Sequence, residues 1–210
     1  MKKYIISLSL ITQIFAFAGV GFYGDVDMFS ATPAASTDAT TGITVTPGDL
    51  NNGIGGGGFV YIDFLPIIDL EFSLEAAGSL YDATMVSGLS TTELPEIPWS
   101  RLSGYVTIRR ELAGASIPFL AKVQLYAGAG VNTHWTTPTV TTGLLTGAFD
   151  GKTLTEIMAL DFTDNLDVED DNADLLLDYA AENLNQTNGV HFQVGAQAKL
   201  LVANLFINAR

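Results

Sequence analysis

The sequence from residue 121 to residue 132 reads Ala-Lys-Val-Gln-Leu-Tyr-Ala-Gly-Ala-Gly-Val-Asn. Its odd positions carry only apolar side chains, and its even positions carry lysine, glutamine, tyrosine, glycine and asparagine. A period of two is typical of a β-strand, because successive side chains point to opposite faces of a sheet. This stretch therefore predicts a strand with one apolar and one polar face.

The same alternation recurs along most of the chain. The apolar faces of the clearest segments carry no charged residue at all. Because the pattern repeats and long helical periodicity is rare, it predicts an all-β fold. The seven segments expected to form strands are 19–29, 54–64, 67–80, 99–110, 119–135, 189–200 and 203–210.

Alternation alone leaves open which face is inside, since a soluble ligand-binding barrel would bury the apolar face. Two features favour an apolar face turned toward lipid. The polar faces are rich in glycine, serine and tyrosine, which suit a narrow interior. Strands of about ten residues, tilted about 45°, match the thickness of the hydrocarbon core of a bilayer.

Long and short connections alternate strictly, as they do in outer-membrane barrels with long extracellular loops and short periplasmic turns. Aromatic residues lie near both ends of the expected strands, as a membrane interface favours. They are Phe29, Trp99 and Trp135 on the loop side, and Phe64 and Phe119 on the turn side. The long connections are 30–53, 80–98 and 136–188, and the short ones are 65–67, 111–118 and 201–203.

The first eighteen residues have the pattern of an export signal. Lys2 and Lys3 precede an apolar stretch that ends in Ala16-Phe17-Ala18, a small-x-small cleavage pattern. The apolar stretch is shorter than the ~20 residues that a membrane-spanning helix needs. We therefore expect a signal peptide over 1–18, a barrel domain over 19–210 and export to the bacterial envelope.

Composition excludes several functional classes. The net charge of −14 disfavours nucleic acid as a partner, and the absence of cysteine excludes disulfides and thiol catalysis. The two histidines, His134 and His191, have no serine at a spacing typical of a catalytic triad. Gly55 to Gly58 lack the lysine of a phosphate loop and indicate a flexible loop end or a thin patch of barrel wall. We expect no enzymatic activity, no cofactor and no catalytic or metal-binding residue.

Together, these strands and connections resemble the small bacterial outer-membrane β-barrels of the OmpA, OmpX and OmpW type. The resemblance covers residues 19–210 and implies a transmembrane, antiparallel, up-and-down barrel of eight strands in the outer membrane. Only seven strands are found, so we expect the last strand to be missing and a gap to separate the first strand from the seventh. The alternatives are that part of 136–149 adds a strand or that the wall closes on seven.

Inside such a barrel the charged residues of the polar faces must pair, because a buried charge survives only with a partner. The third and fourth strands are sequence neighbours, so Arg101 and Arg109 should contact Asp69, Glu71 or Glu75. An interior of eight strands is just wide enough to be filled by side chains, and we expect it to be plugged. The predicted ion-pair network comprises Asp25, Asp27, Asp63, Asp69, Glu71, Glu75, Arg101, Arg109, Lys122 and Lys199.

The segment 136–188 is expected to be an acidic extracellular loop. Between Asp150 and Glu182 it holds eleven acids and one base, with the helical pattern confined to 174–184. A calcium loop of the EF-hand type is disfavoured, because Leu175 and Ala181 stand where glycine and glutamate are needed. The partners expected are outer-membrane lipid and, at this loop, an extracellular ligand or a divalent cation.

The sequence therefore predicts an integral outer-membrane protein with a structural or loop-mediated interaction role. The alternative is a narrow channel or transporter for small or apolar solutes.

Overall fold

The computed structural model describes residues 18–62, 68–117, 121–160, 171–200 and 203–210. Apart from Ala18, the predicted signal peptide lies outside these residues. Seven strands of a nine-stranded sheet follow the order β1-β4-β5-β6-β7-β8-β9, and every neighbouring pair is antiparallel. The strands are β1 (Ala18–Ala31), β4 (Leu50–Ile62), β5 (Asp69–Ser87), β6 (Ser90–Ile117), β7 (Ala121–Thr136), β8 (Asn185–Leu200) and β9 (Ala203–Ala209).

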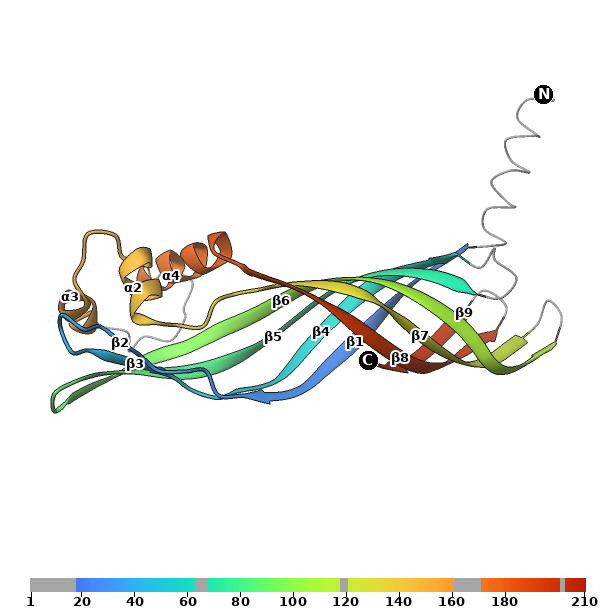
Figure 1. Cartoon of the computed structure of the whole chain (residues 1–210), viewed down its shortest axis with the longest axis horizontal. Coiled ribbons are helices and arrows are strands. Elements are labelled where there is room, and N and C mark those ends of the chain that lie inside the picture. The colour runs from blue at the N-terminus through green and yellow to red at the C-terminus, as the bar shows by residue number, and fades with distance from the viewer. Residues whose placement is uncertain (1–17, 63–67, 118–120, 161–170, 201–202) are drawn as a thin grey trace, which may run out of the picture.

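This sheet curls into a nearly closed barrel (Figure 1). The prediction of a seven-stranded antiparallel barrel is confirmed, but the fold is mostly β and not all-β, because the described residues also form three helices. Among the described residues no ladder joins β1 to β9, which agrees with the expected gap. The alternative in which part of 136–149 adds a strand is wrong, because helix α2 (Thr142–Ala148) begins there instead.

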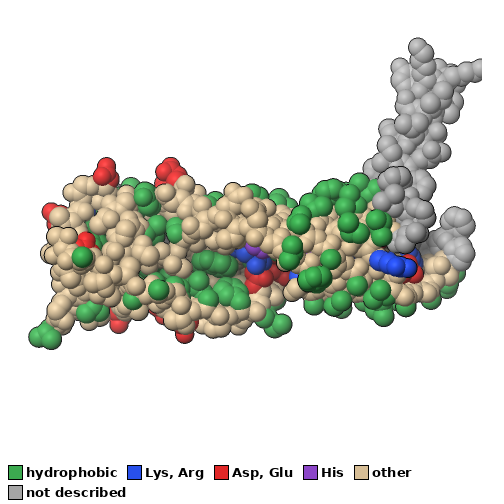
Figure 2. All heavy atoms as spheres, in the orientation of Figure 1, with side chains coloured by type: hydrophobic (Ala, Val, Ile, Leu, Met, Phe, Trp, Pro, Cys, Tyr) green, Lys and Arg blue, Asp and Glu red, His purple; other side chains and the backbone are tan. Residues whose placement is uncertain are grey.

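In the barrel the apolar face points outward and the polar face inward. Phe22 and Phe192 are 90% and 74% exposed, whereas Glu71, Arg109 and Gln193 are buried. Figure 2 shows the apolar side chains gathered over the barrel half of the molecule, with acidic side chains scattered over the other end. The sequence predicted this orientation of the two faces.

The opposite end of the molecule is a compact cap (Figure 1). We define the cap as β2 (Ser36–Thr37), β3 (Thr44–Pro47), residues 81–97 of the β5–β6 hairpin, and the helices α2, α3 (Leu154–Met158) and α4 (Asp171–Glu182). Strand β3 pairs with the far end of β5. The buried core of the cap includes Val45, Met85, Leu145 and Ile157, and it also contains Ile43 just before β3 and Val140 just before α2.

The structure corrects three expectations about the connections. The predicted long loops 30–53 and 80–98 contain paired strands, and the expected short turn 111–118 is mostly strand, because β6 continues to Ile117. The loop 136–188 was expected to hold the one helix of the mature chain, but its described part holds three.

Helices α2 and α3 are too short to show helical periodicity in the sequence, but each begins with a threonine N-cap. Thr141 accepts a hydrogen bond from the backbone N–H of Leu144 at the start of α2. Thr153 and Glu156 form a reciprocal capping box at the start of α3. Among the described residues, no helix is long and apolar enough to span a bilayer.

The charged interior of the barrel as a candidate functional site

Arg109 occupies the centre of the barrel interior. It extends from β6, its side chain is 1% exposed, and its guanidinium lies 2.9 Å from Glu71 and 3.4 Å from Asp69. The guanidinium carbon also lies 4.9 Å from the ring centres of Tyr61 and Tyr126. Two carboxylates and two aromatic faces therefore surround this cation, while its buried Nε has no hydrogen-bond partner among the described residues.

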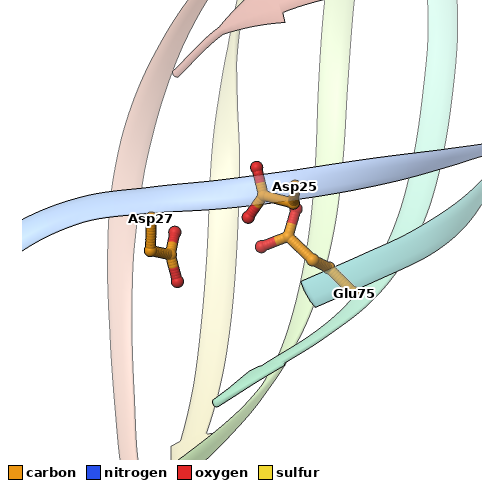
Figure 3. Close-up of side chains that lie close together, drawn as sticks. All are labelled: Asp25, Asp27 and Glu75. Carbon is orange, nitrogen blue, oxygen red and sulfur yellow. The ribbon is translucent and has the colours of Figure 1, made fainter. Parts of the chain in front are cut away.

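Arg101 makes a second cluster closer to the cap. Its Nη2 atom lies 2.7 Å from carboxylate oxygens of both Asp27 and Glu75, and 4.0 Å from Asp25. Asp25 and Asp27 extend from β1 and Glu75 from β5 (Figure 3). The contacts that the sequence predicted between the two arginines and the acids of β5 are therefore present.

Arg210 joins the two clusters. Its guanidinium lies 3.4 Å from Glu71 and 3.3 Å from Glu75, and it also donates to Gln193 and Ser73. Glu71 and Glu75 each accept from two arginines, so the ion pairs form one connected chain. In the described interior this chain opposes three guanidinium groups to five carboxylates: Asp25, Asp27, Asp69, Glu71 and Glu75.

Three further residues belong to the predicted network. Lys122 pairs with Glu111 at 2.9 Å near the turn end, where both side chains are more than a third exposed. Lys199 lies on β8, opposite Lys122 in the ladder. Asp63 lies outside the described residues.

Both histidines face this interior. His191 shares a 2.9 Å hydrogen bond with Thr107, and His134 contacts Ser103 at 2.8 Å and Asn132 at 2.7 Å. The sequence did not indicate Ser103 as a partner of His134, because the two residues are 31 positions apart and only the β6–β7 register places them opposite each other. Ser103 is completely buried.

The oxygens of Asp25, Asp27 and Glu75 form a group that could hold a metal ion, since one oxygen of each lies within 4.8 Å of the others. Oxygen donors suit a hard cation such as calcium. Arg101 already lies between two of these carboxylates and supplies a positive charge. The predicted cation site was instead in the acidic loop, of which residues 161–170 lie outside the described residues.

The barrel wall is open beside these acids. Two cavities of about 320 and 420 Å³ lie between β1 and β9, and both are lined by Asp25, Val26, Asn208 and Arg210. Figure 2 shows charged side chains in a hollow on the visible face of the molecule. The interior is therefore reached from the side.

Comparison with known proteins gives no relative, since no family model, no curated protein and no solved structure matches this chain.

Proposed function

We propose that this protein is an integral β-barrel of the bacterial outer membrane, of the small OmpA, OmpX and OmpW type, that holds its folded cap at the cell surface for interaction with other molecules. The observation that carries the proposal is a change of polarity along β5.

The inward side of β5 is polar in the barrel, where it carries Glu71 and Glu75, and apolar in the cap, where it carries Tyr81 and Met85. The outward side changes in the opposite sense. It is apolar in the barrel, with Leu70, Phe72 and Leu74, and polar in the cap, with Asp82 and Thr84. A strand whose outward face changes from apolar to polar passes from a lipid-like to an aqueous surrounding. This is the pattern of a strand that leaves a membrane.

The apolar part of β5 has the length that a bilayer needs. From Leu70 to Leu80 the strand rises about 33 Å at ~3.3 Å per residue. A tilt of about 45° reduces this to a band about 23 Å tall, close to the ~25 Å of outer-membrane barrels. On β6, outward-facing Arg110 borders this band on the turn side.

An interaction role is supported by the charge of the sequence segments that include the cap. Sixteen of the 23 acids and one base, Lys152, lie in segments 32–53, 80–98 and 136–188. An excess of acids of this size attracts cations and basic partners and repels acidic ones.

A narrow channel is the second candidate, and the opening between β1 and β9 favours it. The ion pairs around Arg109 oppose conduction along the axis, because they fill the interior at that level. Planar-bilayer recording separates the two functions. We expect no steady single-channel steps from the purified protein, and such steps would instead support the channel.

Carbonate washing of membranes tests the location. An integral barrel stays in the membrane pellet, whereas recovery in the soluble periplasmic fraction would overturn the proposal.

A further inference from the structure

The chain contains two Asn-Gly dipeptides, Asn52-Gly53 on β4 and Asn188-Gly189 on β8. An asparagine that precedes glycine is open to deamidation, because glycine has no side chain to keep its backbone nitrogen away from the carboxamide. Both asparagines are exposed to solvent. A difference in reactivity between them must therefore come from the backbone and the contacts that surround each one.

Asn52 lies opposite a β-bulge between β1 and β4. Asp27 pairs with Gly53, and Ser30 pairs with Asn51. Two residues of β1 therefore face Asn52 alone on β4. The ladder between β4 and β5 begins only after Gly53. Asn52 thus has no ladder partner in either neighbouring strand.

The backbone of Asn52 is in the left-handed region, with a φ of 40°. Among the described residues it is the one non-glycine residue with a positive φ. This region is unfavourable for residues with a Cβ, although asparagine tolerates it better than most. An unpaired and strained backbone leaves its conformation more readily than one that is held by a ladder.

Asn188 is held in place on β8. It pairs with Thr133 in the β7–β8 ladder, which runs past it on both sides without a register shift. Its Oδ1 atom also accepts a 2.8 Å hydrogen bond from Thr133 Oγ1. Backbone and carboxamide are both fixed, which opposes the rotation that brings the side-chain carbon to the next backbone nitrogen.

We infer that Asn52 is a site of spontaneous deamidation through a cyclic succinimide and that the fold protects Asn188. The backbone nitrogen of Gly53 attacks Cγ of Asn52, and the Cγ–Nδ2 bond breaks. The proton of the attacking nitrogen passes through water to the departing nitrogen, which leaves as ammonia. One water then opens the ring. Hydrolysis at Cγ gives aspartate, and hydrolysis at the main-chain carbonyl carbon gives isoaspartate.

The bulge accommodates the isoaspartate, whose backbone is one carbon longer than that of asparagine. At this level β4 has one residue where β1 has two, so an added carbon in β4 reduces the mismatch. The same addition at Asn188 would displace a continuous ladder. Both products at residue 52 also add a carboxylate close to the cap, because Leu50 belongs to the buried core of the cap. The inference is independent of the proposed function, since the reaction needs only this fold and water.

Peptide mapping of the purified full chain tests this inference. Folded protein in detergent micelles is incubated at mildly alkaline pH, sampled over time and digested. Mass spectrometry measures deamidation at Asn52 and Asn188, and electron-transfer fragmentation separates isoaspartate from aspartate. A parallel incubation in guanidinium chloride gives the rates in the unfolded chain.

Gly53→Ala is the matched variant. A Cβ at this position would approach no listed atom closer than 3.4 Å, so alanine fits the folded structure. The added methyl group hinders attack by the backbone nitrogen. Heat-modifiable gel mobility shows whether the barrel of the variant is folded.

In the folded protein Asn52 should deamidate several-fold faster than Asn188, with isoaspartate among the products. In guanidinium chloride the two rates should become similar, because the dipeptides are the same. Folded Gly53→Ala should react several-fold more slowly at Asn52.

Equal rates at Asn52 and Asn188 in the folded protein, or a faster reaction at Asn188, would overturn the inference. An unchanged rate at Asn52 in folded Gly53→Ala would overturn the succinimide route. If this variant does not fold, the comparison of the two asparagines in the unsubstituted protein decides. Neither result bears on the membrane location, which carbonate washing tests separately.

Discussion

Arg109 on β6 and Glu71 on β5 form a charge-assisted hydrogen bond of 2.9 Å, with side chains only 1% and 4% exposed. A buried ion pair adds little net stability compared with apolar residues of the same shape, but removing one partner leaves the other charge stranded. The interior network is therefore sensitive to single substitutions.

Arg109→Ala should lower the free energy of unfolding by about 3–5 kcal/mol, because Glu71 and Asp69 lose their buried partner. Urea unfolding in micelles measures this. Lys122→Ala is the matched control, since its pair with Glu111 is exposed and worth at most about 1 kcal/mol. Equal losses for the two variants would show that the Arg109 pair is not buried.

The outward side of β5 offers a matched pair of arginine substitutions. Phe72→Arg places a charge within the proposed lipid-facing band and should cost about 2–4 kcal/mol. Asp82→Arg lies on the outward side of the same strand in the cap and should be nearly neutral. Unfolding of both variants in lipid bilayers measures the difference. Similar values would argue against a lipid boundary between these positions.

The cap should behave as a separately packed core. Leu145 is completely buried, so Leu145→Ala should cost about 2–5 kcal/mol through lost apolar burial and the cavity left behind. We expect faster proteolysis within the cap and an unchanged heat-modifiable barrel. Leu89→Ala is the control because Leu89 is fully exposed. Simultaneous loss of the barrel would show that the two parts unfold together.

The start of α3 should weaken in acid. Hydrogen bonds from the Thr153 backbone N–H and hydroxyl hold the pKa of Glu156 below its ordinary value. A depressed carboxyl pKa contributes stability above the ordinary value of about 4.3, and this contribution is lost as pH falls through the folded value. An NMR titration of the Glu156 carboxyl should therefore show a low pKa, and Thr153→Val should raise it. A normal pKa in the unsubstituted protein would contradict the capping box.

The barrel could be predicted from the sequence because its signal is continuous. Every strand repeats the same alternation, and the β5–β6 pairing follows from a single hairpin, which places Arg109 opposite Asp69. Arg210 directly follows β9, which is distant from β5 in the sequence, and it contacts Glu71 and Glu75. Arg210 links the two clusters only because the curvature of the whole sheet brings it close to β5, and the sequence pattern does not show that curvature.

The cap was underestimated because its core comes from segments far apart in sequence. Val45, Met85, Leu145 and Ile157 lie on four different elements, and of these only Met85 belongs to a long periodic pattern, that of β5. The glycines at 55–58 were interpreted as a flexible loop end or a thin patch of barrel wall. They lie inside β4, so the loop end is wrong and a place in the wall is correct. A Cβ on Gly57 would come within 2.8 Å of the Tyr23 ring, so glycine leaves room for an interior tyrosine.

The central claim is that the surrounding of β5 changes from lipid to water between Leu80 and Asp82. The most direct measurement uses spin labels in protein reconstituted in bilayers. Each label is attached to a single cysteine that replaces Phe72, Leu74, Asp82 or Thr84. Relaxation of the label by oxygen reports a lipid surrounding, and relaxation by a water-soluble nickel chelate reports water. The account predicts dominant oxygen accessibility at 72 and 74, and dominant nickel accessibility at 82 and 84. High nickel accessibility at all four sites would contradict it.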